Sequence, residues 1–206
     1  MRQGITDTTW HFGHQGKGLS HFLASLSNAQ KERIVTRLSP FYPALQALDT
    51  IQNKAGWIDI QIAEHFPNAH QIHAGHISDG SLRLIALASL PELNHPISLI
   101  LIDEIEDGLD PHILPDFIDS ISQEQNTQWV MTSHSPVLVN RFGPEQVHFL
   151  TRAETGETLS IRFDEIKEIQ ADLEYQGAGE IWFHTSNSTI EQWLKNTLSC
   201  QKIREA

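Results

Sequence analysis

Two short apolar segments of this chain each lead into residues that could do chemistry. Residues 97–102 are followed directly by Asp103 and Glu104, and residues 129–131 come shortly before His134. Because ligands gather at the carboxyl ends of the strands of a parallel sheet, we expect the two carboxylates and the imidazole to converge there. One carboxylate could hold magnesium and the other could orient or deprotonate water, as phosphoryl transfer requires.

Each of these residues also has a purely structural interpretation. Asp103 and Glu104 could cap a helix or lie in a solvated acidic loop after a core strand. His134 taken alone is more typical of a structural histidine with its hydrogen bonds satisfied. The functional interpretation therefore depends on further elements.

A third polar segment lies upstream of the carboxylates. Ser78, Asp79, Gly80 and Ser81 come immediately before the apolar residues 82–90. If those residues form a helix, free backbone N–H groups and the helix dipole at its start favour an anion. An ordinary N-cap is the alternative.

The apolar patterns predict the elements that position these residues. Helical spacing predicts one or two amphipathic helices in residues 19–38, and alternation predicts a half-buried strand over residues 57–62. Residues 82–90 are apolar nearly all round, which predicts a buried helix ending near Pro91.

Residues 97–131 predict a βαβ unit with a right-handed crossover. The continuous apolar run of residues 97–102 is typical of a strand covered on both faces of a parallel sheet. Asp110 and Pro111 supply an N-cap and a first helical residue, and Pro115 should remove one hydrogen bond or shift the start of the helix.

We predict a single domain over residues 1–206, because no repeat, low-complexity tract or charge run marks a linker. A helical and strand region (1–76) comes before the core that carries the polar segments (77–142). The remaining residues (143–206) predict a β-hairpin and a final helix with a capping box of Ser188 and Glu191.

Composition limits the partners. The 14 Lys and Arg against 26 Asp and Glu leave a net charge of −12, which excludes nonspecific nucleic-acid binding through overall charge. The one cysteine, Cys200, excludes an internal disulfide. No stretch approaches about 18 consecutive apolar residues, and the start lacks the pattern of a signal peptide, so we expect a cytoplasmic protein without membrane contact.

In this order and spacing the segments resemble the ABC-type ATPase heads of the SMC and RecF kind, especially bacterial AAA-family ATPases of the RecF-like or AAA_21 type. Residues 78–81 are similar to the signature motif, residues 99–104 to the Walker B strand and residues 132–136 to the switch-histidine motif. Residues 106–111 resemble the D-loop, with Asp110 where many relatives have histidine. Residues 177–182 resemble a Gly-Glu-Leu-Trp segment near the end of several family members.

The resemblance implies a role for each site residue. Asp103 would hold Mg²⁺ through water, Glu104 would polarise the attacking water and His134 would sense the γ-phosphate of ATP. Asp110 would lie at a dimer interface. The signature residues would contact nucleotide held by the partner subunit: Ser78, Asp79, Gly80 and Ser81.

The resemblance also implies a fold, cofactors and partners. The expected fold is a three-layer α/β P-loop NTPase with a mainly parallel sheet, without its N-terminal lobe. The expected cofactors are ATP and Mg²⁺. The expected partner is a second copy or a complementing ATPase half that carries Walker A, with DNA contacted through a partner or through missing segments. DNA repair or defence against phage or plasmids would be the process.

The motif that cradles phosphate is absent from the sequence. The pattern G-x-x-x-x-G-K-[ST] fails at the one Gly-Lys pair, Gly16-Lys17, because His11 occupies the first glycine position and Gly18 the hydroxyl position. The chain therefore resembles the C-terminal half of an ATPase head. The residues do not distinguish whether the chain is a fragment, the product of a split gene or a degenerate remnant.

Three other interpretations remain. His70, His73 and His76, spaced by three, could bind a transition metal, although Pro67 and Gly75 indicate a loop there. A two-metal nuclease could use the five carboxylates at residues 103, 104, 106, 107 and 110. A non-catalytic module could keep the fold and the dimer surface while binding nucleotide poorly.

Overall fold

The computed structural model describes residues 3–5, 18–66, 71–93, 97–122, 127–153 and 155–204. The chain divides into two compact units, residues 1–132 and 133–206, and each is described by itself. This boundary falls inside the expected core of residues 77–142, and the single domain stays a prediction.

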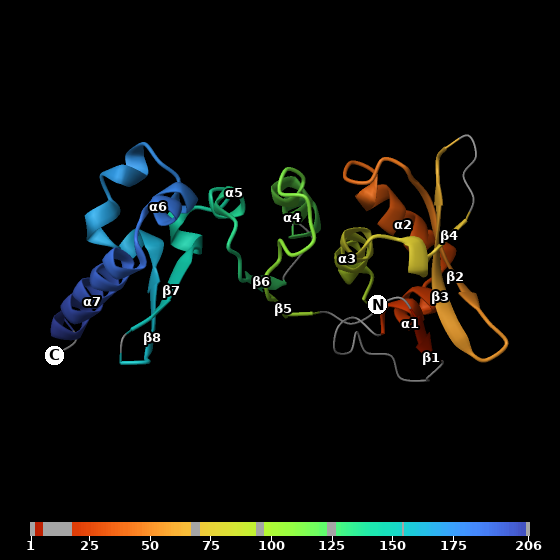
Figure 1. The fold of residues 1–206 in the computed structure, drawn as a ribbon, viewed down its shortest axis with the longest axis horizontal. Coiled ribbons are helices and arrows are strands. Elements are labelled where there is room, and N and C mark those ends of the chain that lie inside the picture. Colours follow the sequence, from red (N-terminus) through yellow and green to blue (C-terminus); the bar gives the residue numbers. More distant parts are fainter. Residues whose placement is uncertain are drawn as a thin grey trace. The chain divides into compact units, whose positions relative to one another are not determined.

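The first unit is built around an antiparallel sheet (Figure 1). Strand β3 (Trp57–Glu64) pairs with β1 (Gln3–Ile5), with β2 (Leu45–Gln52) and with β4 (Ile72–His73). The turn from β2 to β3 is closed by Asn53, whose side chain accepts the N–H groups of Ala55 and Trp57 at 2.9 and 3.0 Å. A connection this short requires antiparallel pairing.

Helices α1 (Leu19–Ser25) and α2 (Asn28–Leu38) contact β2 and β3. The two helices are separate because Ser27 caps the start of α2 with a capping box. The side chain of Ser27 accepts the backbone N–H of Gln30, and the side chain of Gln30 accepts the backbone N–H of Ser27. The core between helices and sheet consists of fully buried apolar side chains, among them Phe22, Leu23, Ile34, Leu38, Ile60 and Ile62.

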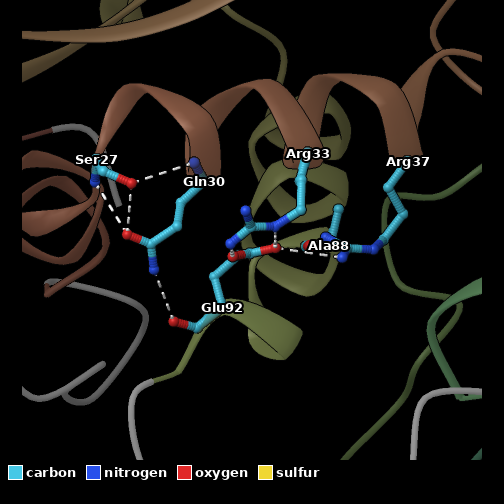
Figure 2. Close-up of polar contacts among 6 residues, drawn as sticks. All are labelled: Ser27, Gln30, Arg33, Arg37, Ala88 and Glu92. Carbon is cyan, nitrogen blue, oxygen red and sulfur yellow. Dashed lines mark hydrogen bonds and ion pairs between the residues drawn. The ribbon is translucent and has the colours of Figure 1, made fainter.

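Helix α3 (Asp79–Ala88) contacts α2 and is followed by the short 3-10 helix Leu90–Glu92. Figure 2 shows how their ends are joined: Glu92, only 6% exposed, accepts from Arg33 at 2.5 Å and from Arg37 at 3.3 Å. Arg37 also donates to the carbonyl of Ala88 at 2.5 Å. These charge-assisted bonds attach the C-terminal end of α3 to α2.

The predicted βαβ unit is present. Strand β5 (Leu99–Ile102) pairs in parallel with β6 (Gln128–Met131), and α4 (Leu114–Ser122) lies between them in the chain. Helix α4 begins three residues after Pro111, with Pro115 in its first turn, where a proline costs no helical hydrogen bond. This is the shift that Pro115 predicted.

The sequence predicts that the first strand of this pair is covered on both faces, but one face of the β5–β6 pair is exposed. Leu99 is 46% exposed, Leu101 70% and Val130 45%. These three side chains alternate with the more buried Ile100, Ile102, Trp129 and Met131. The described residues therefore cover only one face of this pair.

The second unit begins with α5 (Pro136–Val139), followed by the hairpin of β7 (His148–Arg152) and β8 (Thr158–Arg162). Helix α6 (Ala178–His184) and helix α7 (Asn187–Arg204) complete it. Three 3-10 helices lie between β8 and α6: Phe163–Glu165, Lys167–Ile169 and Asp172–Glu174. The core includes Phe149 and Phe163, whose ring centroids are 4.7 Å apart, with Ile161, Ile166, Ile181 and Leu194.

The α/β class and each predicted element are confirmed, with two differences. The described strands pair mostly antiparallel, and among them only β5 and β6 are parallel. Short turns join β2 to β3 and β7 to β8, and such turns allow only antiparallel pairing, whereas α4 lies between β5 and β6. The capping box of Ser188 and Glu191 is wrong. Ser186 accepts the N–H of Thr189 instead, Ser188 lies inside α7, and Glu191 pairs with Lys195.

The sequence predicts the turn of the β7–β8 hairpin at Glu154, Thr155 and Gly156, of which Glu154 lies outside the described residues. Among the residues that the structure describes, none of the helices combines the length and the apolar character needed to cross a bilayer.

Candidate functional site

The signature segment, residues 78–81, forms the start of α3. Ser78 is the N-cap: its hydroxyl oxygen accepts the N–H of Ser81 at 3.0 Å and its hydroxyl donates to Ser81 Oγ at 2.8 Å. Asp79 is the first helical residue and is exposed. The capping interpretation of Ser78 is therefore confirmed, and the cap leaves the segment at the surface of the first unit.

The first turn of α3 also contacts Tyr42. The hydroxyl of Tyr42 donates to Glu64 at the end of β3. Burial, the bond to Glu64 and the charge of that carboxylate raise the pKa of Tyr42 above its ordinary value, while a hydrogen bond with Ser81 lowers it. Tyr42 is therefore protonated at neutral pH and remains a donor beside Ser81.

Gly80 lies against the acidic loop, which we define as residues 103–110. A Cβ added at Gly80 would be 2.2 Å from the carbonyl oxygen of Gly108, which itself has a positive φ of 68°. No real side chain fits at that distance. A glycine is needed here because two backbone segments approach closely.

Thr132 holds both carboxylate residues at the end of β5. Its hydroxyl donates to Asp103 Oδ1 at 2.5 Å and accepts the backbone N–H of Glu104 at 2.8 Å. The register of the parallel pair explains the contact, because Ile102 lies opposite Met131 and the next residue of each strand follows alongside. Both Asp103 and Glu104 are exposed.

The backbone of Glu104 has a conformation that is uncommon for a residue with a side chain. Its φ is +47°, and it is the one described residue other than glycine with a positive φ. Such outliers are costly and persist where the surrounding contacts determine them. Here the N–H of Glu104 donates to the hydroxyl of Thr132, and the carbonyl of Glu104 accepts from Arg83 of α3 at 2.6 Å.

Asp110 ends the acidic loop and begins the turn before α4. Its Oδ1 accepts the N–H of His112 at 2.8 Å, and its carbonyl accepts from Ile113 and Leu114. It is exposed. Asp110 therefore caps the turn of residues 111–113 and not α4 itself, which begins at Leu114, so the predicted helix N-cap is wrong. The role at a dimer interface stays a prediction.

His134 belongs to the second unit, whereas the acidic loop belongs to the first. Its ring lies 6.3 Å from that of Trp182 in α6, tilted by 34°. Close to it, α5 and α6 approach so tightly that a Cβ at Gly179 would be 2.2 Å from the carbonyl oxygen of Pro136. The convergence of His134 with the carboxylates stays a prediction.

The structure thus brings together the signature segment, Asp103 and Glu104 within the first unit. Thr132 and Arg83 are the residues for which the sequence predicted no role. Strand register could have indicated Thr132, since it follows β6 as Asp103 follows β5. No local pattern indicates Arg83. The residues weighed against a phosphate loop, His11 and Gly16-Lys17, lie outside the described residues.

Within the described ranges, no three His, Cys, Asp or Glu side chains form a group that could hold a metal ion. Asp107 pairs instead with Arg83, and Asp110 caps a turn, so the nuclease interpretation loses its cluster. His73 lies 3.3 Å from Asp59 and contacts Gln61, while His70 lies outside the described residues.

Solved SMC structures show a partial likeness to this chain. An SMC ATPase from work on ATP-driven dimerization and DNA-stimulated activation is 16% identical, with a TM-score of 0.49; the match covers 73% of this chain and 94% of that one. The Smc head domain with a coiled coil and joint from Pyrococcus yayanosii is 15% identical, with a TM-score of 0.49. That match covers 71% of this chain and 29% of the Pyrococcus yayanosii chain. The Pyrococcus furiosus Smc head bound to the C-terminal domain of ScpA is 18% identical, with a TM-score of 0.47. That match covers 71% of this chain and 38% of the Pyrococcus furiosus chain.

A comparison with curated proteins found no match. Residues 12–140, more than half of the chain, match the AAA_21 family of AAA domains, whose description proposes an AbiEii toxin of type IV toxin–antitoxin systems. The match includes the signature segment, both strands of the parallel pair, the acidic loop and His134. At family level this is a nucleotide-binding ATPase fold. The chain belongs to the AAA_21 family.

Proposed function

We propose that this chain is the part of an ATPase that supplies the hydrolytic carboxylates and a signature segment. The observation that carries the proposal is the pair of Thr132 bonds, which fix the Asp103 carboxylate and the Glu104 backbone next to each other at the end of β5. Phosphoryl transfer is catalysed by positioning and charge neutralisation, for which such a prearranged pair of acidic residues is suited.

Asp103 fits magnesium as a ligand. It offers a hard carboxylate oxygen, is exposed, and is oriented by the Thr132 hydroxyl. Mg²⁺ in such sites takes one or two carboxylates and completes its shell with water and nucleotide phosphates, which fits the lack of a larger acidic group among the described residues. Bound Mg²⁺ and ATP supply the reacting phosphoryl group and neutralise its charge.

Glu104 is the residue that orients and polarises the attacking water. Its carboxylate follows Asp103 directly, and its backbone is held on both sides, by Thr132 and by Arg83. A carboxylate carried on a fixed backbone can be placed beside the attacking water and act as a general base. His134 then senses the γ-phosphate in the assembled site.

The signature segment acts in trans, on nucleotide held by a partner subunit. Ser78, Asp79, Gly80 and Ser81 form the N-cap and the start of a ten-residue helix, with Ser78 and Asp79 exposed, and backbone N–H groups and the dipole there favour an anion. Because the sequence lacks a phosphate-cradling motif, the lysine and the loop must come from outside these 206 residues. A P-loop half, joined to this chain or provided separately, is the partner that we propose.

The test compares the isolated chain with the completed assembly. The isolated chain should show no binding of Mg²⁺–ATP at micromolar concentrations in calorimetry and negligible turnover. Coexpression with the polypeptide encoded immediately upstream should give a complex that releases phosphate from ATP. An upstream sequence without a strand and phosphate loop, or micromolar ATP binding by the isolated chain, would contradict the split site.

A non-catalytic dimerisation module is the second candidate, favoured by the missing phosphate loop. It predicts that the assembled complex dimerises but hydrolyses no ATP. Hydrolysis that disappears in Glu104→Gln excludes this candidate.

The process that the ATPase serves is defence against phage or plasmids, or DNA repair. The description of the family, which refers to a toxin of type IV toxin–antitoxin systems, favours defence. Deletion of the gene should then increase phage plating without raising sensitivity to DNA damage. The reverse result would favour repair.

A further inference from the structure

We propose that Arg83 is a positioning residue that joins the signature helix to the peptide of Glu104. Through it, α3 and the water-orienting carboxylate keep one relative arrangement. The inference rests on the proposed function, because it assigns to α3 and Glu104 the roles given above.

The guanidinium of Arg83 donates to three acceptors of the acidic loop. One terminal nitrogen donates to the carbonyl oxygens of Glu104 at 2.6 Å and of Asp103 at 3.3 Å. The other donates to Asp107 Oδ2 at 3.3 Å. The side chain is 21% exposed, so most of it is packed. The planar fork of an arginine suits several acceptors at once, whereas a lysine presents one point charge.

The two carbonyl bonds matter more than the ion pair. Asp107 is 72% exposed, and an ion pair with so exposed a partner contributes little. The Glu104 carbonyl also accepts the N–H of Asp107 at 3.0 Å, so Arg83 reinforces the turn that gives Glu104 its positive φ. Without Arg83 the Glu104 carbonyl would keep only the local bond from the Asp107 N–H among the bonds named here, and no bond would join it to α3.

A second contact makes the arrangement specific to α3. Gly80, three residues before Arg83, lies against the Gly108 carbonyl at the other end of the acidic loop. Gly80 in the first turn of α3 and Arg83 in the second therefore contact the two ends of the acidic loop. A shift of α3 when its N-terminus meets an anion would move the Glu104 peptide with it, because Arg83 bonds directly to the Glu104 carbonyl.

The first experiment uses this chain alone and measures amide hydrogen exchange by NMR. Arg83→Gln should speed exchange of the Glu104 and Ile105 amides about tenfold or more, with no change in the amides at the centre of α3 or in the melting temperature. Arg83→Lys, which keeps the charge, should also speed exchange. Asp107→Asn should leave both amides within about twofold of the parent.

The second experiment uses the completed ATPase. Arg83→Lys should lower kcat about tenfold while the KM for ATP stays within about twofold, because Arg83 positions Glu104 and does not contact nucleotide. Arg162→Lys is the matched control: Arg162 pairs with Asp164 in the second unit, and its replacement should leave kcat unchanged.

The outcomes separate this inference from the proposed function. Unchanged exchange at Glu104 in Arg83→Gln and Arg83→Lys overturns the role of Arg83, as does an unchanged kcat in an active assembly. A parent assembly without ATPase activity contradicts the proposed function instead, and the exchange measurement still decides whether Arg83 holds the Glu104 peptide.

Discussion

At the scale of single residues, the candidate site depends on hydrogen bonds to backbone groups. Thr132 accepts the N–H of Glu104, Arg83 donates to its carbonyl, and Gly80 allows the acidic loop to pass close to α3. Of these contacts, the bond from Thr132 to Asp103 is the one that reaches a candidate carboxylate directly. The reactive carboxylates are thus oriented mainly through the main chain that carries them.

Replacing the two carboxylates in the completed ATPase should have different effects. Glu104→Gln should leave nucleotide binding intact and reduce hydrolysis by about a hundredfold or more, the scale of a general base. Asp103→Asn should weaken the dependence of nucleotide binding on Mg²⁺. Phosphate release and ATP titrations at several Mg²⁺ concentrations measure both. A Glu104→Gln protein that hydrolyses ATP at the parental rate would show that the acidic loop only caps and solvates.

Gly80→Ala should destabilise the chain by about 1–3 kcal/mol, because the added Cβ would overlap the Gly108 carbonyl and backbone atoms must shift. Gly75→Ala is the matched control, since a Cβ at Gly75 meets nothing within 4 Å. It should change stability by less than about 0.5 kcal/mol. Urea unfolding of both variants measures the difference. Equal stability of the two would mean that the close approach is absent in solution.

At the scale of elements, the two ends of α3 are fixed in different ways. The N-terminal end meets the acidic loop, and the C-terminal end is attached to α2 through Glu92, as Figure 2 shows. The signature segment is therefore presented by a helix that is anchored at both ends. This anchoring explains why a short helix can hold Arg83 and Gly80 in register with the loop.

Glu92→Ala should lower the free energy of unfolding by about 1–3 kcal/mol. The expected cost is moderate because Arg33 is 56% exposed and can turn to water, whereas Arg37, 11% exposed, loses its carboxylate but keeps the bond to Ala88. Denaturant unfolding at neutral pH measures it. Asp172→Ala, an exposed position in the second unit, is the control and should change little. A loss below about 0.5 kcal/mol would contradict the anchoring role.

The ion pair of Lys31 in α2 with Asp49 in β2 predicts a pH dependence. The hydrogen bond from Lys31 lowers the pKa of Asp49 below its ordinary value. A carboxyl whose folded pKa is lowered stabilises the fold fully above its unfolded pKa, and the contribution disappears as the pH falls through the folded value.

Asp49→Asn should therefore reduce stability at neutral pH, by at most about 1 kcal/mol since the aspartate is 70% exposed. The difference from the parent should shrink as the pH falls below the ordinary aspartate pKa and vanish once the pH is below the lowered pKa of Asp49 in the folded chain. The midpoints of urea unfolding of the variant and of the parent, determined at several pH values from acid to neutral, measure this difference. A difference that persists unchanged at the lowest pH would indicate that Asp49 acts through packing.

At the scale of the whole molecule, the proposed site is distributed over more than one chain. In the function that we propose, Asp103 and Glu104 would serve the nucleotide of their own subunit, while the signature segment would serve that of the partner. Such a division makes hydrolysis depend on dimerisation, because neither subunit alone contains a complete site.

A mixing experiment tests this division. A completed subunit with Ser78→Arg and a second subunit disabled in its phosphate loop should each be inactive alone. Mixed together they should regain part of the activity, because one of the two composite sites then contains only intact parts. The ATPase rate is measured against the mixing ratio.

Thermal melts of each protein are the control, because loss of the Ser78 cap by itself should cost about 1 kcal/mol and should not depend on the partner. A flat, inactive curve from well-folded proteins that form mixed dimers would contradict action in trans.

The local elements of this fold could be predicted from the sequence. Helical spacing located α1 and α2, the nearly continuous apolar residues 82–90 located α3, and alternation located β3. The apolar runs before Asp103 and Thr132 located the parallel pair. These features depend on residues close together in the chain, whose period and caps reflect local backbone geometry. The placement of Asp103 and Glu104 directly after β5 was therefore available without a structure.

The tertiary structure decided what holds that site. The Arg83 bonds join residues about twenty positions apart, and the Gly80–Gly108 approach joins two turns that share no pattern. The antiparallel order around β3 likewise follows from strands such as β2, whose LQALDTIQ sequence alternates too weakly to predict. Such contacts arise only when packed elements bring distant backbone groups together, and local periodicity carries no information about them.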